Sequence, residues 1–116
     1  MTRGNINFIS QKRGQVPKTL FFYWNGDQYP SGLRDCFGVL DLVSEPITKK
    51  RFTEWAEKNY EGVKVKSITQ PKMYYTDGFI TDYSYVFEEN EIKVWEWDKP
   101  VFTGNREELI SWIKKQ

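Results

Sequence analysis

The sequence contains no histidine and one cysteine, Cys36. These absences exclude an internal disulfide, remove the side chains that most transition-metal sites use, and leave the thiol without its customary catalytic base. No stretch approaches the roughly 20 consecutive apolar residues that cross a membrane, and the first residues lack the apolar run of a signal peptide. We therefore expect a cytoplasmic protein with no cofactor, no metal and no membrane contact.

An excess of charge of either sign is also missing. Seventeen Lys and Arg residues oppose sixteen Asp and Glu residues, which gives a formal net charge of +1. A nearly neutral chain has no global field that would attract nucleic acid or an acidic substrate. We expect a protein partner instead, and the sequence leaves the oligomeric state open.

Aromatic residues are abundant, at 17% of the 116 residues. Each large ring removes on the order of 150 to 250 Å² from water when it is buried. A chain of this length fits one domain, residues 1–116, and its composition predicts a core built from rings.

The first half alternates between two kinds of periodicity. Residues 5–10 and 19–24 have strand character, separated by a polar turn, and predict a hairpin. Apolar residues then recur at helical spacing from Leu33 to Val43 and place Cys36 on the buried stripe. A second helix begins near Pro46, turns Phe52, Trp55 and other apolar residues inward, and ends at Gly62.

The second half favours strands. Residues 63–67 alternate, residues 83–87 and 92–97 form the clearest hairpin, and residues 101–102 add a short edge strand. Asn105 and Glu108 have capping-box spacing and predict a last helix. The order β-β-α-α-β-β-β-α predicts an α+β fold with a mainly antiparallel sheet and helices packed against it.

The loop at residues 24–32, Trp-Asn-Gly-Asp-Gln-Tyr-Pro-Ser-Gly, is rich in turn residues. Asn25, Gly26 and Asp27 tolerate left-handed backbone, and Pro30 fits a first helical turn. Ser31 is the expected N-cap of the following helix.

This loop, together with the opening Met-Thr-Arg-Gly-Asn-Ile, resembles a group of small uncharacterised phage and bacterial proteins. Those proteins open with Gly-Thr-Arg-Ser and carry Trp-Asp-Gly-Tyr-Pro-x-Gly after their second strand, and residues 82–97 are similar to their tyrosine-rich hairpin. The chain departs from that pattern by having Gln28 at a glycine position, an inserted Gly26 and no histidine. The resemblance implies a phage or prophage accessory gene and no particular mechanism.

Large rings in predicted loops are typical of interface anchors. Because no catalytic motif is present, the sequence favours a non-enzymatic protein that binds or inhibits a host or defence protein. The expected partner-binding residues are Trp24, Asn25, Asp27, Tyr29, Tyr74, Tyr75 and Phe79.

Two alternatives stay open. The helix start at Pro30, Ser31 and Gly32, with Arg34 and Arg3, is a potential site for a nucleotide or another small anion. Asp77 and Asp82 are a potential carboxylate pair for a weak metal-dependent hydrolase.

Two further patterns have ordinary structural explanations. Core packing of the aromatic hairpin is favoured over a base-stacking surface made of Tyr83, Tyr85, Lys93, Trp95 and Trp97. The basic run at residues 49–51 is expected to be a solvated helix face that pairs with Glu54 and Glu57, with a contact surface as the alternative.

Overall fold

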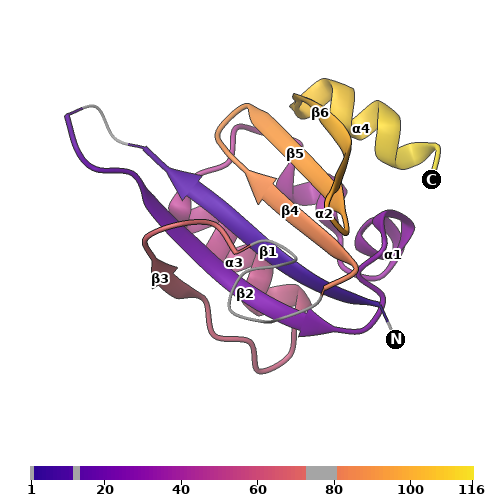
Figure 1. Cartoon of the computed structure of the whole chain (residues 1–116), viewed down its shortest axis with the longest axis horizontal. Coiled ribbons are helices and arrows are strands. Elements are labelled where there is room, and N and C mark those ends of the chain that lie inside the picture. The colour runs from indigo at the N-terminus through magenta and orange to yellow at the C-terminus, as the bar shows by residue number, and fades with distance from the viewer. Residues whose placement is uncertain (1, 12–13, 73–80) are drawn as a thin grey trace.

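The computed structural model describes residues 2–11, 14–72 and 81–116, in which helices cover one face of a six-stranded sheet (Figure 1). Along the chain the elements are β1 (Arg3–Ser10), β2 (Lys18–Asn25), α1 (Pro30–Asp35), α2 (Val39–Leu42), α3 (Lys49–Asn59), β3 (Lys66–Ile68), β4 (Tyr83–Phe87), β5 (Glu91–Glu96), β6 (Lys99–Asn105) and α4 (Arg106–Lys114).

The strands lie in the order β3-β2-β1-β4-β5-β6. Every neighbouring pair is antiparallel except β1 and β4, which run parallel in the centre of the sheet. Both predicted hairpins form, β1 with β2 and β4 with β5. The α+β class and the mainly antiparallel sheet are therefore confirmed, although β3 is shorter and β6 longer than expected.

Aromatic rings form the core between the sheet and α3, as predicted. The rings of Phe8 and Phe52 stack with their centroids 5.5 Å apart, and Phe22 meets Tyr60 edge-on at 4.7 Å. Trp55 is also buried on α3. Such contacts contribute about 0.5 to 1.5 kcal/mol each beyond the area they bury, so these rings fix α3 on the sheet.

The single helix predicted over residues 33–43 is wrong. Gly38 adopts a φ of 63° and divides this region into α1 and α2. Cys36 lies at the end of α1 and is exposed, so the prediction of a buried thiol is also wrong. Tyr29 occupies the N-cap position without a side-chain hydrogen bond, which corrects the assignment of Ser31 as the cap.

The capping box of α4 is confirmed. Asn105 accepts a 2.8 Å hydrogen bond from the Glu108 amide, and Glu108 accepts a 3.1 Å bond from the Asn105 amide. None of the helices in the described part of the chain has the length and hydrophobicity needed to span a membrane.

The sheet face opposite the helices carries two buried asparagines on β1. Asn7 exchanges hydrogen bonds of 3.0 and 2.8 Å with the backbone of Lys72, and the Asn5 amide donates to the Thr81 hydroxyl at 3.2 Å. Buried polar groups stay stable only when they are hydrogen-bonded. The two side chains therefore fix the chain on either side of residues 73–80.

Candidate functional site at one end of the sheet

Four segments that are distant in the sequence meet at the end of the sheet where β1 begins, near the N-terminus in Figure 1. The Gly26 amide donates to the Thr2 carbonyl at 2.9 Å. The Arg3 amide donates to the Asp82 carboxylate at 2.8 Å, and the Trp97 amide donates to the Asp82 carbonyl at 3.0 Å. The Asp82 amide also donates to the Arg3 carbonyl at 3.0 Å, so hydrogen bonds connect the β2–α1 loop to the β5–β6 turn.

Backbone strain is concentrated at this end. Among the residues that the structure describes, Asp27 (φ 54°) and Trp97 (φ 57°) are the non-glycine residues with positive φ. Trp97 occupies the first position of the two-residue turn between Glu96 and Lys99, where such turns favour glycine. Left-handed backbone at a non-glycine residue costs on the order of 1 to 3 kcal/mol and is concentrated at functional sites.

The same end exposes large apolar side chains. The exposed fractions are 48% for Trp97, 38% for Tyr29 and 37% for Val101. Trp97 and Val101 border a hollow of about 430 Å³ that the β5–β6 turn also lines. We call this region the Trp97 surface and define it as Asp27, Tyr29, Glu96, Trp97, Asp98 and Val101.

Gln28 holds the loop beneath Tyr29 in place. Its side chain is fully buried and donates to the Gly26 carbonyl at 2.9 Å. The Tyr60 hydroxyl donates to the Gln28 side-chain oxygen at 3.0 Å, and the Tyr85 hydroxyl donates to the Gln28 carbonyl at 2.6 Å. The loop is therefore anchored to α3 and β4.

Two glycines make this packing possible. A Cβ atom on Gly4 would lie 2.8 Å from the Cβ of Gln28, so only glycine leaves room for the glutamine over β1. A Cβ atom on Gly32 would overlap with the carbonyl oxygen of Asp27. Glycine at both positions allows the loop to pack closely on the strand and the helix.

The Trp97 surface is acidic. Arg3 lies 3.9 Å from Asp82, whereas Asp27, Glu96 and Asp98 leave a local excess of negative charge over Lys99. The negative charge of Asp27 is the main cause that raises the pKa of Tyr29. Burial raises the pKa of Tyr83, and the charges of Glu96 and Asp82 add to that shift.

The structure separates the residues that the sequence assigned to partner binding. Asn25, Asp27 and Tyr29 are exposed at this end. Trp24 is half-buried, and its ring packs edge-on against Tyr60 at 5.1 Å and Phe37 at 6.4 Å. Trp24 therefore contributes mainly to the core. The remaining three expected residues lie outside the described residues; they are Tyr74, Tyr75 and Phe79.

Both arginines of the alternative anion site are engaged elsewhere. Arg34 forms a two-bond pair with Asp35 at 2.8 and 3.0 Å and donates to carbonyls at the end of α4, including that of Gln116 at 2.8 Å. Arg3 pairs with Asp82. Ser31 and Gly32 lie in the first turn of a helix of only six residues. These contacts leave no convergent cationic group at the start of α1.

The hydrolase alternative depends on a carboxylate pair, and Asp77 lies outside the described residues. Asp82 accepts the amide of Arg3, which gives it a structural role. Within the described ranges, no group of three or more Cys, Asp or Glu side chains is arranged to hold a metal ion.

Sequence reasoning missed Trp97 as a surface residue. Alternation over residues 92–97 placed it on a strand, and core packing was favoured for the aromatic hairpin. Tyr85 is buried and stacks on Phe87 at 6.3 Å, as that interpretation predicts. Trp97 instead begins the turn, and the Trp-Asp-Lys-Pro run at residues 97–100 was the available turn signal.

Comparison of the chain with protein-family models, curated proteins and solved structures finds no match. The geometry of the site therefore carries the functional reasoning.

Proposed function

We propose that this chain is a non-enzymatic binding protein whose Trp97 surface docks a positively charged segment of a protein partner. The observation that carries the proposal is a tryptophan that is 48% exposed on left-handed backbone and that lines a hollow together with Glu96 and Asp98.

The chemistry of the surface favours Arg or Lys in the partner. A guanidinium or ammonium over an indole face gains about 0.5 to 1 kcal/mol at an exposed site and about 2 kcal/mol when desolvated. Glu96 and Asp98 flank the indole in sequence and line the same hollow. They add charge complementarity, which increases the association rate more than the affinity.

The class of partner follows from the sequence resemblance. The opening residues and the β2–α1 loop resemble small phage and bacterial proteins, so a host or defence protein with an exposed basic segment is the partner that we propose. Occupying such a segment would make the chain an inhibitor of that protein.

Isothermal titration of an Arg/Gly-repeat peptide into the full chain tests the proposal, with a Glu/Gly repeat of equal length as the matched control. We expect binding of the basic peptide alone, and loss of that binding in Trp97→Ala. Glu57→Ala is the control variant, because Glu57 is exposed on α3 outside the Trp97 surface. Equal heats for the two peptides, or full binding by Trp97→Ala, would contradict the proposal.

A further inference from the structure

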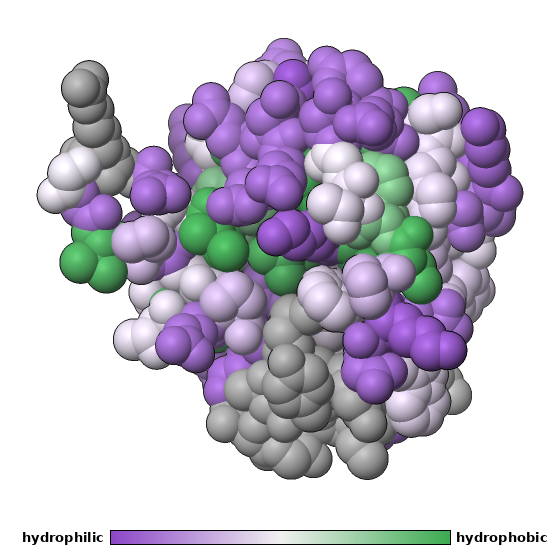
Figure 2. All heavy atoms as spheres, turned by 45° about the horizontal axis from the view of Figure 1, so that its top comes forward, coloured by the Kyte–Doolittle hydropathy of each residue, from purple (hydrophilic) through white to green (hydrophobic). Residues whose placement is uncertain are grey.

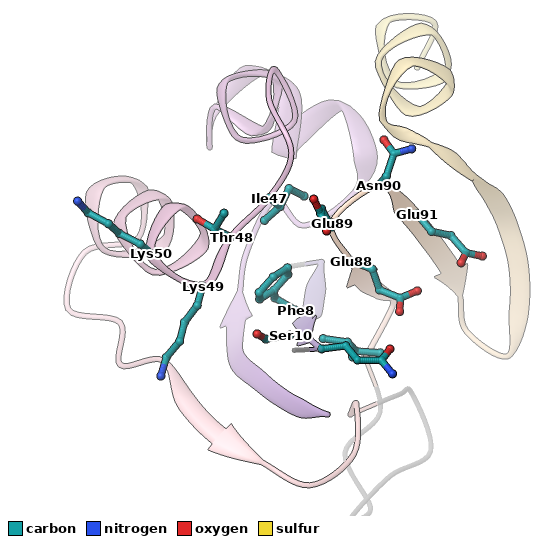
Figure 3. Close-up of a pocket in the computed structure, with 12 residues that line it drawn as sticks. Phe8, Ser10, Ile47, Thr48, Lys49, Lys50, Glu88, Glu89, Asn90 and Glu91 are labelled. Carbon is teal, nitrogen blue, oxygen red and sulfur yellow. The ribbon is translucent and has the colours of Figure 1, made fainter. Parts of the chain in front are cut away.

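A second surface lies at the opposite end of β1, beyond the residues of the Trp97 surface. A hollow of about 850 Å³ opens between the start of α3 and the β4–β5 turn. Figure 3 shows Phe8 and Ile47 between its two walls, and these side chains are 3% and 1% exposed. These two core residues lie beneath the hollow, and Ser10, Gln11 and Thr48 also line it.

The two walls carry opposite charges. Lys49 and Lys50 project from α3 on one side. On the other side, Glu88 and Glu89 project from the β4–β5 turn and Glu91 from the start of β5 (Figure 3). The positive end of the α3 dipole lies on the lysine side and adds to that charge.

Most of these charges are weakly paired within the chain. Lys50 lies 3.9 Å from Glu54, and Glu91 lies 3.9 Å from Lys93; these side chains are 45% to 83% exposed. Exposed pairs of this kind contribute little to stability. No ion pair within the described ranges involves Lys49.

The third residue of the basic run differs from the two lysines. Arg51 donates to the backbone carbonyls of Glu45, Pro46 and Asp41 at 2.7, 3.1 and 2.9 Å. It therefore fixes the segment before α3. Lys49 and Lys50 instead place positive charge at the helix start, which the dipole disfavours. The pair of Lys50 with Glu54 is the one expected for a solvated helix face, and a contact surface is the alternative explanation for the charge of Lys49.

From this charge pattern we infer that the hollow is the interface of a two-fold symmetric dimer of this chain. A two-fold axis presents the same patch on both copies, so the patch must complement itself. Rotation about an axis through the hollow brings the lysine wall of each copy against the glutamate wall of the other. A patch of a single charge would repel its own copy.

The hairpin beside the hollow supplies an apolar contact. The pairing of β1 with β4 ends at Phe8, whereas the pairing of β1 with β2 continues to Ser10. The β1–β2 hairpin therefore extends past the end of β4. Val16 lies in the segment that leads into β2 and is 84% exposed. In Figure 2 the segment that leads into β2 stands away from the rest of the molecule. The same view shows apolar surface between hydrophilic side chains across the middle of the molecule. In the dimer, the exposed Val16 side chain is available for an apolar contact with the partner copy beside the charged walls.

Sedimentation velocity of two charge-reversed variants, alone and mixed, tests this inference. Lys49→Glu/Lys50→Glu makes both walls negative, and Glu89→Lys/Glu91→Lys makes both walls positive. We expect the unmodified chain to dimerise, each variant alone to dimerise at least roughly tenfold more weakly, and an equimolar mixture to form heterodimers. Circular dichroism of each variant verifies that it folds.

A monomeric unmodified chain at all accessible concentrations would overturn the inference. A mixture that stays monomeric, or variants that each dimerise like the unmodified chain, would also overturn it. Trp97→Ala is the control that separates the two surfaces, because it is expected to leave the dimer intact. The dimer and the peptide binding at the Trp97 surface can therefore fail independently.

Discussion

The Tyr85 hydroxyl on β4 donates a 2.6 Å hydrogen bond to the backbone carbonyl of Gln28, 57 positions away in the chain. This bond is buried and joins the central sheet to the loop that carries Tyr29. Together with the bond from Tyr60 to the Gln28 side chain, it positions one side of the Trp97 surface before any partner binds.

We expect Tyr85→Phe to lower the free energy of unfolding by about 1 to 3 kcal/mol, because the buried Gln28 carbonyl then lacks its partner. Urea denaturation followed by fluorescence measures the change. Tyr29→Phe is the matched control and is expected to change stability by less than about 0.5 kcal/mol, because Tyr29 is exposed. Equal stability of Tyr85→Phe and Tyr29→Phe would contradict the role of this hydrogen bond.

We expect alkaline pH to destabilise the fold through the same tyrosines. Burial raises the pKa of Tyr60 and Tyr85 above the usual 10.0, so both phenols stay protonated in the folded state. The unfolded chain loses these protons near its ordinary pKa. Stability is therefore complete below pH 10 and falls as pH rises above it. Urea denaturation from about 2 pH units below to about 1.5 pH units above the ordinary tyrosine pKa measures this fall, and Tyr60→Phe should reduce its slope.

We expect Gly32→Ala to destabilise the chain by about 1 to 3 kcal/mol, because the added methyl group overlaps with the Asp27 carbonyl. Thermal denaturation compares it with Ser31→Ala, whose hydroxyl caps no helix. The serine variant should differ from the unmodified chain by less than about 0.5 kcal/mol. A larger loss in the serine variant would show that Ser31 caps the helix after all.

The strain at Trp97 predicts an order of stability between two variants. Trp97→Gly and Trp97→Ala lose the same indole, but only glycine adopts a φ of 57° without steric conflict. We expect the glycine variant to be more stable by about 1 kcal/mol. Chemical denaturation measures the difference, and a more stable alanine variant would contradict the assignment of strain.

Local sequence signals predicted much of the fold. The β4–β5 hairpin, the buried stripe of α3 and the capping box of α4 each depend on residues close together in the chain. The break between α1 and α2 was not predictable from periodicity, because the apolar spacing continues across Gly38 while its backbone is left-handed.

The candidate site was only partly predictable. Tyr29 and Asp27 follow from the turn-rich loop, but a loop glutamine is ordinarily solvated. Gln28 is buried because Tyr60 and Tyr85 reach it from distant elements. The exposure of Trp97 depends on the pairing of Glu96 with Lys99, which makes residues 97–98 the turn. The contacts of Gln28 join residues 32 and 57 positions apart, so they leave no local signal in the sequence.

The most direct test of the account is an amide and indole NMR titration of the full chain with the Arg/Gly-repeat peptide. We predict that the indole resonance of Trp97 and the amides of Asp27 and Tyr29 shift in a saturable way that salt weakens, while the amides of residues 47–50 stay in place. Absence of a shift at Trp97, or shifts spread evenly over the surface, would contradict the assignment of the Trp97 surface as the binding site.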